Sequence, residues 1–488
     1  MRGAFRCSSG LCLAWFLAGL ATFFPAGTGP LVAAEPPSFL VILCDDLGYG
    51  DLACYGHPTI QTPRLDKLAS EGIRFTECYA AAPVCSSSRA GLMTGRCPSR
   101  AGIYDWIPAN HPMHLAKEHT TVATLLKQAG YSTCHVGKWH LTGKFNSSEQ
   151  PQPADHGFEH WMSTQNNAAP SHENPTNFVR NGLPIGPQSG YSCDVVAKEA
   201  VRWLRELRTK SKPFFLFVCF HEPHEPVASP PDLVAKYQGQ ATKEGQAEYF
   251  ANVTNMDRAV GQVLDALDEL KLRDETLVFF TSDNGPETLL RYPGAKRSHG
   301  SAGPFRGMKL HLYEGGLRVP GILRFPGRVR PGQVVAEPVC GLDLLPTCCE
   351  LAGVKLPQRK LDGTSFVPLL NGQPLVRTTP LYWHYFRSIG APKAALRVGD
   401  YVVLGKWDGP QLGPGGSVHH GDCNVIKSAR LVDFELYNLR EDPAQAHDLA
   451  RKEPAKLQEL STQLVNKYTE VQQEGPVWEV PRATGKDK

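Results

Sequence analysis

The chain has 488 residues, of which 41% are hydrophobic and 20% charged, and its formal net charge is +3. This composition is typical of a soluble globular protein and excludes a disordered, coiled-coil or collagen-like chain. The charge is small and no Lys/Arg-rich run or basic tail is present, which argues against nucleic acid as the main partner. An anionic ligand would therefore be held by a few placed cations rather than by an overall field.

The first 34 residues have the parts of a secretory signal peptide in the right order. Arg2 and Arg6 form a short basic region, residues 11–24 are mostly apolar, and residues 32–34 are small, as a cleavage site requires. A retained membrane anchor is the alternative, but the apolar stretch is short for a bilayer span. We expect an exported protein (periplasmic, extracellular, or lysosomal in a eukaryote) that does not contact a membrane after cleavage.

Apolar runs alternate with helical patterns from residue 38 to about residue 350. Continuous apolar runs predict strands that are covered on both faces at residues 39–44, 214–219 and 277–281, with a shorter candidate at 132–136. Start and stop signals predict helices at 62–72 and 120–130, and an amphipathic pattern predicts a longer helix at 248–270. The alternation predicts an α/β fold with a large, mostly parallel mixed sheet flanked by helices.

The pattern changes after about residue 372. A pair of strands is predicted over residues 396–406, another short strand over 434–439, and a closing amphipathic helix over 455–472. We therefore expect a catalytic domain at 35–372 and a smaller C-terminal α+β domain with an antiparallel sheet at 373–488.

Polar side chains follow each of the four predicted strands. They are Asp45 and Asp46, Lys138 and His140, His221 and His224, and Asp283 and Asn284. Each pair also has a simpler explanation, such as a helix cap, an Asp-Asn-Gly turn or a surface loop. Because ligands bind outside the carboxyl ends of parallel strands, four such clusters predict one site. Carboxylate and amide oxygens suit calcium or magnesium, whereas no usual zinc spacing of His and Cys is present.

Cys85 is the candidate nucleophile. It stands at the start of a predicted helix, with Arg89 one turn later, and this placement favours anions. The alternative is a buried cysteine near a serine-rich helix start.

These motifs resemble the type I sulfatases of the alkaline phosphatase superfamily, in family order from about residue 38 to residue 450. The motifs that carry the resemblance are Asp45-Asp46-Leu47-Gly48, Cys85-Ser86-Ser87-Ser88-Arg89 with Thr94-Gly95-Arg96, Gly137-Lys138-Trp139-His140, Pro223-His224-Glu225-Pro226, Ser282-Asp283-Asn284-Gly285, and Lys309 ahead of Tyr313-Glu314-Gly315-Gly316. The resemblance implies an alkaline phosphatase-like fold and hydrolysis of sulfate esters.

The resemblance also implies roles for individual residues. A maturation enzyme would oxidise Cys85 to formylglycine, and calcium would be held by the residue at position 85 together with Asp45, Asp46, Asp283 and Asn284. Lys138 and Lys309 would neutralise the sulfate oxygens while Arg89 orients the nucleophile. His224 would protonate the leaving oxygen, shared with Lys309, and His140 would accept a proton when sulfate is released. His221 matches no catalytic position, and Arg318 is expected to be structural.

One position departs from the family pattern. The residue two after the cysteine is normally Pro, sometimes Ala, and here it is Ser87, within the short motif that maturation enzymes read. Two alternatives follow: a glycan-binding member in which Cys85 stays unconverted, and a neighbouring serine that acts as an unmodified nucleophile. A phosphate or phosphonate ester hydrolase is a further alternative.

The substrate is expected to be a sulfated carbohydrate, with small aryl sulfates as the alternative. The loops at 104–119, 163–190 and 381–392 would grip it. The polar and aromatic residues expected to do so are Trp106, His111, His114, Asn166, Asn167, His172, Trp383, His384 and Arg387.

Overall fold

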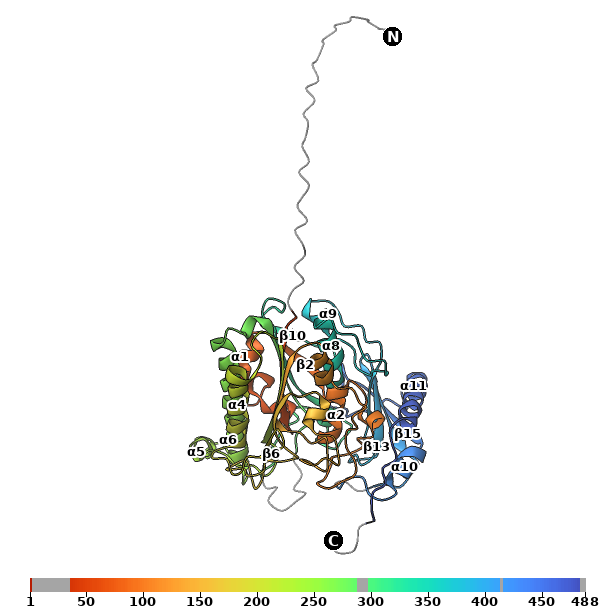
Figure 1. Ribbon diagram of the computed structural model, residues 1–488. Coiled ribbons are helices and arrows are strands. Elements are labelled where there is room, and N and C mark those ends of the chain that lie inside the picture. The colour runs from red at the N-terminus through yellow and green to blue at the C-terminus, as the bar shows by residue number, and fades with distance from the viewer. Residues whose placement is uncertain (2–35, 288–296, 413–415, 483–488) are drawn as a thin grey trace, which may run out of the picture. The chain divides into compact units, whose positions relative to one another are not determined.

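The computed structural model describes Met1 and residues 36–287, 297–412 and 416–482 (Figure 1). Apart from Met1, the predicted signal peptide therefore lies outside the described residues. Among the described residues, a mixed sheet of eleven strands has the order β10-β2-β9-β8-β1-β7-β3-β4-β5-β6, with β11 paired to β2. Its strands are β1 (Ser38–Asp45), β2 (Ile73–Tyr79), β3 (Ser132–Lys138), β4 (His160–Thr164), β5 (Val179–Arg180), β6 (Leu183–Pro184), β7 (Phe214–Pro223), β8 (Thr276–Ser282), β9 (Arg318–Arg324), β10 (Gln333–Val335) and β11 (Val339–Cys340).

The four predicted apolar runs form the centre of this sheet as parallel neighbours β8, β1, β7 and β3. Val41 of β1 lies beside Phe217 of β7 and Phe279 of β8. Every residue of β1 is buried, since successive side chains point to opposite faces and both faces are covered by helices. The parallel pairing brings the carboxyl ends of these strands to one edge.

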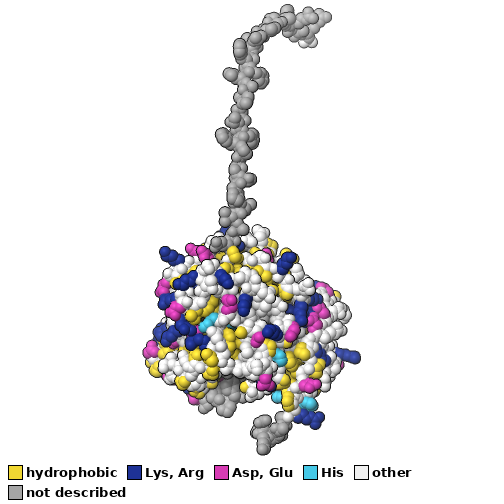
Figure 2. All heavy atoms as spheres, viewed as in Figure 1, with side chains coloured by type: hydrophobic (Ala, Val, Ile, Leu, Met, Phe, Trp, Pro, Cys, Tyr) yellow, Lys and Arg dark blue, Asp and Glu magenta, His cyan; other side chains and the backbone are white. Residues whose placement is uncertain are grey.

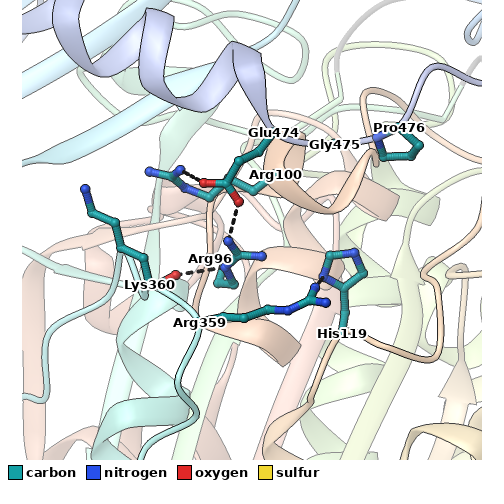
Figure 3. A pocket seen from close by; sticks show the side chains of 8 residues that line it. All are labelled: Arg96, Arg100, His119, Arg359, Lys360, Glu474, Gly475 and Pro476. Carbon is teal, nitrogen blue, oxygen red and sulfur yellow. Dashed lines mark hydrogen bonds and ion pairs between the residues drawn. The ribbon is translucent and has the colours of Figure 1, made fainter.

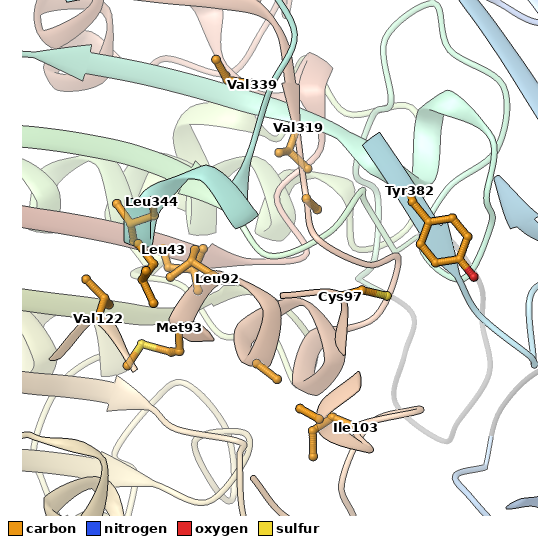
Figure 4. Close-up of a cluster of buried hydrophobic side chains, with 14 of the residues drawn as sticks. Leu43, Leu92, Met93, Cys97, Ile103, Val122, Val319, Val339, Leu344 and Tyr382 are labelled. Atoms are coloured by element: carbon orange, nitrogen blue, oxygen red, sulfur yellow. The ribbon is translucent and has the colours of Figure 1, made fainter. Parts of the chain in front are cut away.

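Helices cover both faces of the sheet. On one face, α1 (Pro63–Ser70), α4 (Ser192–Arg202) and α6 (Gln246–Glu269) pack on Leu40 and Ile42 (Figure 1). On the other, Phe39, Val41 and Leu43 pack against a group that includes Leu92 and Met93 of α2 and Val122 of α3 (Figure 4). The remaining helices of this part are α2 (Cys85–Thr94), α3 (Val122–Gln128), α5 (Pro231–Tyr237), α7 (Glu314–Leu317), α8 (Leu344–Leu351) and α9 (Val367–Leu370).

A second, antiparallel sheet of four strands follows among the described residues, in the order β12-β13-β14-β15. It consists of β12 (Leu381–His384), β13 (Pro392–Val398), β14 (Tyr401–Trp407) and β15 (Leu431–Asn438), accompanied by α10 (Asp422–Ser428) and α11 (Pro454–Gln473). The predicted fold class, a large mixed sheet with a smaller antiparallel part, is thus confirmed. Leu396 and Leu464 of this part belong to the same buried cluster as Leu43 and Leu92, so the two sheets share a core. The domain boundary at residue 372 stays a prediction.

Ion pairs fasten the end of α11 to the segment that follows α2. Arg100 is paired with Asp362, Glu470 and Glu474. Figure 3 shows its pair with Glu474, together with Arg96, which donates to Glu474 and to the Lys360 carbonyl. A pocket here is lined by Arg96, Arg100, His119, Arg359, Lys360, Glu474, Gly475 and Pro476. Because the Arg100 side chain is buried, these carboxylates are needed to balance its charge.

The strands that flank the four central ones were not predicted. β9 runs antiparallel to both β2 and β8, and β4 extends the sheet beyond β3. All twelve described cysteines are free thiols. Among the described residues, no helix combines the length and the apolar character that a membrane span requires. On the face shown in Figure 2, basic and acidic side chains are intermingled.

Candidate active site

The polar residues that follow β1, β3 and β8 converge at one edge of the sheet, as predicted. Asp45 ends β1, Lys138 ends β3, and Asp283 directly follows β8. Gly137 allows β3 to lie close to β7 just before the lysine, because a Cβ on Gly137 would lie 1.8 Å from the Cys219 carbonyl oxygen. Asp46 has a left-handed backbone (φ 64°), a conformation that is uncommon away from glycine and turns the chain at the site.

Three carboxylates are bound there by three cationic side chains. Lys138 Nζ donates to Asp45 Oδ2 over 2.5 Å, and Lys309 Nζ donates to Asp46 Oδ2 over 2.8 Å. Arg89, reaching from α2, donates from Nε to Asp283 Oδ2 over 2.9 Å and from Nη1 to the Lys138 carbonyl over 2.8 Å. All of these side chains are buried, so their charges act through a poorly screening medium.

Burial and mutual repulsion pull the carboxyl pKa values apart. Burial raises the pKa of Asp45, but Lys138, His224 and Arg89 outweigh it and hold this pKa well below its usual range. For Asp283, burial and the charge of Asp45 together raise the pKa to about 7. Burial lowers the pKa of Lys309, but Asp46 outweighs it and raises this pKa above its usual range, so the ammonium stays charged.

Two oxygens of the cluster have no hydrogen-bond partner among the described residues, namely Asp45 Oδ1 and Asn284 Oδ1. The Asn284 amide nitrogen donates to Asp46 Oδ1 over 2.7 Å, which leaves its oxygen for another ligand. A buried acceptor without a partner is costly, and a bound cation would satisfy it. Asp45, Asp46 and His224 place one ligand atom each within 4.8 Å of one another, close enough to hold a metal ion.

Cys85 begins α2 and is 3% exposed. The helix starts after the extended residue Val84 and ends at Gly95, whose left-handed backbone (φ 65°) allows its N–H to bond the Gly91 carbonyl. Burial raises the pKa of the Cys85 thiol, although Lys138 and Lys309 act in the opposite direction. The thiol is therefore protonated at neutral pH, which makes it a poor nucleophile as it stands.

His140 is fixed by hydrogen bonds that define its tautomer. Its Nε2 lies 3.2 Å from the Ile107 carbonyl, which can only accept, so Nε2 carries the hydrogen. Nδ1 is buried without a partner among the described residues and holds the lone pair. The Ile107 N–H in turn donates to Ser86 Oγ over 3.0 Å, which ties this loop to α2 one residue after Cys85. Burial, with Lys138 and Arg89 nearby, lowers the pKa of His140 well below its usual range.

His224 follows β7 and faces the carboxylates. Its Nδ1 lies 2.5 Å from the Glu225 carbonyl and must carry a hydrogen, while Nε2 lies 3.5 Å from Asp46 Oδ2. Burial and Lys309 lower the pKa of His224 to about 4. At neutral pH its Nε2 is therefore a base or a ligand, and it donates a proton only after protonation.

Several residues that contact the proposed catalytic side chains have roles that the sequence did not predict. Asn167, which was predicted to grip the substrate, accepts through Oδ1 from Lys138 Nζ over 3.2 Å, a contact that was not predicted. The strand-end rule applied to β4 would have found it, because Asn167 follows that strand. Ser86 and Ile107 carry no motif signal, since one acts through a serine hydroxyl and the other through its backbone. His221 donates to or accepts from Thr164 Oγ1 in the interior, in agreement with a structural role.

The expectation that Trp383, His384 and His172 grip the substrate is wrong. Trp383 is 2% exposed and donates to the Ala80 carbonyl. His172 is fully buried, with its Nδ1 3.2 Å from the Asn252 amide nitrogen. Burial lowers the pKa of His384 to about 3, and its ring packs on Tyr468. Each of these side chains has one ring nitrogen engaged within the protein, which assigns it to packing rather than to substrate binding.

The sequence of this chain matches a known protein family over most of its length. A family model described as Sulfatase matches residues 37–354, which include every proposed catalytic and metal-binding residue. The chain belongs to the sulfatase family. Arylsulfatase A from Homo sapiens is 34% identical to this sulfatase over 461 residues, with 86% of this chain and 84% of that protein covered. N-acetylgalactosamine-6-sulfatase from Canis lupus familiaris is 34% identical over 403 residues, covering 77% of this chain and 73% of that protein.

A solved structure agrees with the fold of this sulfatase. Ps i-CgsB is 26% identical, with a TM-score of 0.76, and the match covers 91% of this chain and 95% of that chain. The structure of Ps i-CgsB has also been solved in complex with k-i-k-neocarrahexaose. The predicted type I sulfatase family and the activity of a sulfuric ester hydrolase are confirmed. Sulfatases of this family generally use calcium and formylglycine.

Proposed function

We propose that this sulfatase removes sulfate from a sulfated carbohydrate, with formylglycine formed from Cys85 and with one bound calcium ion. The observation that carries the proposal is the convergence of Lys138 and Lys309 on a buried carboxylate cluster beside the start of the Cys85 helix. Two fixed ammonium groups attract the oxygens of an anionic sulfate ester, and a poorly screening surrounding strengthens this attraction.

The donor set fits calcium. Asp45, Asp46, Asp283 and Asn284 supply hard oxygen atoms, two of which lack a partner among the described residues. The raised pKa of Asp283 reflects crowded negative charge that a divalent cation would relieve. Bound there, calcium would act as a Lewis acid toward the sulfate oxygens. The position of His224 Nε2 near Asp46 adds a possible nitrogen ligand, which calcium accepts less readily than oxygen.

The remaining residues have roles that follow from their protonation states. Position 85 would hold the formylglycine, whose hydrate would supply the attacking hydroxyl and a second hydroxyl for release of sulfate. Lys138 binds a sulfate oxygen, and Lys309, which is protonated, donates from Nζ to the leaving oxygen, assisted by His224 when that ring is protonated. His140 Nδ1 accepts a proton, because its Nε2 is held by the Ile107 carbonyl. Arg89 holds Asp283 in place.

The carbohydrate preference is supported by the relatives. N-acetylgalactosamine-6-sulfatase and Ps i-CgsB, the latter solved with a neocarrahexaose, are both similar to this chain. Arylsulfatase A is equally similar at 34% identity, which keeps small aryl sulfates as the second candidate. Values of kcat/KM for sulfated sugars and for nitrophenyl sulfate decide between them, and a preference for the aryl ester would overturn the carbohydrate assignment.

The nucleophile is tested at Cys85 itself. Active protein should carry an aldehyde at position 85 in the mass spectrum of the peptide, and Cys85→Ala should be inactive although folded. Cys85→Ser should react at most once and accumulate a stable sulfate ester, because serine has a single hydroxyl. Full turnover by protein shown to contain plain cysteine at this position would contradict the proposal.

Ser87 bears on maturation rather than on chemistry. Its hydroxyl donates to the Ile103 carbonyl over 3.0 Å, away from the carboxylates. Ser87→Pro should therefore raise the fraction converted by a maturation enzyme in a generic host and leave turnover per converted molecule nearly unchanged. Unconverted Cys85 in protein from the native host, together with glycan binding, would instead support the non-catalytic alternative. We also propose that the protein is exported.

A further inference from the structure

A second pocket lies next to the candidate active site along the edge of the sheet. Its volume is about 510 Å³, and segments that leave the carboxyl ends of β3 and β4 line most of it. The lining includes Asn110, Lys144, Phe145, Glu149, Gln165 and Asn177. Because β4 is the neighbour of β3 in the sheet, this pocket continues the edge that carries Lys138 by one strand.

Two lining amides connect the pocket to proposed catalytic residues. Gln165 Nε2 donates over 3.0 Å to the Ile107 carbonyl, the same oxygen that holds His140 Nε2. On the other side, Asn177 Nδ2 donates over 2.8 Å to the backbone carbonyl of Asn167, whose side-chain oxygen accepts from Lys138 Nζ. Two successive hydrogen bonds therefore link the pocket to His140, and two others link it to Lys138. A ligand group bound in the pocket would be close to a sulfate bound at Lys138.

The chemistry of the lining suits an uncharged sugar. No described residue is hydrogen-bonded to the Asn110 side-chain amide or to Gln165 Oε1. Both groups are therefore available for hydrogen bonds with sugar hydroxyl groups, which donate and accept. The half-buried Phe145 ring, packed edge-on against Trp161 at 5.7 Å, supplies apolar surface for a sugar's C–H face. Lys144 and Glu149 form an ion pair with each other. Since these two charges cancel, the pocket does not favour a second sulfate.

We propose that this pocket binds the unsulfated sugar residue adjacent to the sulfated one, so that the preferred substrate is an oligosaccharide rather than a monosaccharide. This inference rests on the proposed function, because it requires a sulfated carbohydrate at Lys138. It names Asn110, Phe145 and Gln165 as residues that contact the neighbouring sugar.

Calorimetric binding to inactive protein tests the pocket without turnover. Cys85→Ala protein is titrated with 6-sulfated N-acetylgalactosamine, with a sulfated carrageenan hexasaccharide and with the monosulfated monosaccharide that this hexasaccharide yields. Ala109→Trp fills the pocket, and Asn110→Gly removes the amide without strain, because glycine adopts the left-handed backbone of Asn110 (φ 64°). Asp433→Gly, another exposed left-handed residue (φ 48°) but on β15, is the matched control.

The hexasaccharide should bind more tightly than its own monosaccharide. Ala109→Trp and Asn110→Gly should each weaken hexasaccharide binding by about tenfold, the loss of roughly one good hydrogen bond, and should reduce the ratio between the two ligands. Asp433→Gly should change neither. Equal affinity for the two ligands, or a ratio unchanged by Ala109→Trp, would overturn the subsite. Failure of the proposed function looks different, because then none of the three sulfated sugars would bind while active protein would still cleave nitrophenyl sulfate.

Discussion

Ser86→Ala should slow the sulfatase through His140, although the Ser86 hydroxyl bonds to the backbone of Ile107 rather than to a proposed catalytic side chain. The substitution removes the acceptor of the Ile107 N–H, a bond of 3.0 Å in the interior. A buried N–H left without a partner costs about 1–3 kcal/mol, which is enough to displace the loop. If the Ile107 carbonyl then no longer holds His140 Nε2, kcat should fall by about 5- to 150-fold, the same energy expressed as a rate.

Ser88→Ala is the matched control. Ser88 lies on the same helix and its Oγ accepts from the Ala81 N–H over 3.2 Å, but this bond leads away from His140. Both variants should lose a similar amount of unfolding free energy in urea. Rates with nitrophenyl sulfate, divided by the converted fraction from mass spectrometry, should fall only for Ser86→Ala. Equal losses of kcat in the two variants, or none in Ser86→Ala, would refute the positioning role of Ser86.

Three further results are expected. Removal of calcium by a chelator should abolish turnover, and Asp283→Ala should lower kcat at least about 100-fold while circular dichroism stays unchanged; full activity after verified metal removal would count against the ligand set. Sulfate monoesters should be hydrolysed with a higher kcat/KM than matched phosphate monoesters, because one cation with Lys138 and Lys309 suits a monoanion; comparable values would favour a phosphate ester hydrolase. Burial raises the pKa of Asp257 to about 7 against backbone hydrogen bonds from Leu65 and Arg64 that lower it. The folded state therefore keeps a proton that the unfolded chain has lost, and between pH 4 and pH 7 this group should reduce stability by up to about 1.4 kcal/mol per pH unit as pH rises. Asp257→Asn should remove that part of the slope in urea unfolding, and an unchanged slope would show that Asp257 does not cause it.

The centre of the fold was predictable because its strands are buried on both faces. Residues 39–44 and 214–219 are continuous apolar runs, and their only stable place is between two layers of helices. β9 contains two arginines and a proline, so its sequence lacks both an apolar run and a clear alternation. β4 is short and polar at its end, and its identity as a strand depends on pairing with β3. The strands with which β9 and β4 pair lie elsewhere in the chain, so a local sequence pattern does not reveal β9 and β4 as strands.

The site was predictable to the extent that strand ends determine it. Asp45, Lys138 and Asp283 follow strands, so the parallel topology alone brings them together. The protonation of His140 depends instead on a carbonyl from a loop 33 residues away. Trp383 and His384 look like substrate-binding residues because aromatic and imidazole groups in loops serve both purposes. Only the burial of Trp383 and the packing of the His384 ring on Trp407 and Tyr468 show that they belong to the core.

The complete burial of α2 has a consequence for the order of events during synthesis. All ten residues from Cys85 to Thr94 are buried, and Arg89 is bonded to Asp283, nearly two hundred positions later in the chain. An enzyme that must bind this segment in order to oxidise Cys85 cannot reach it in the folded protein. Access to the segment therefore ends when β8 packs against the rest of the sheet. If Cys85 is converted as proposed, conversion must be complete before this docking, and a chain that folds more slowly would contain a larger active fraction.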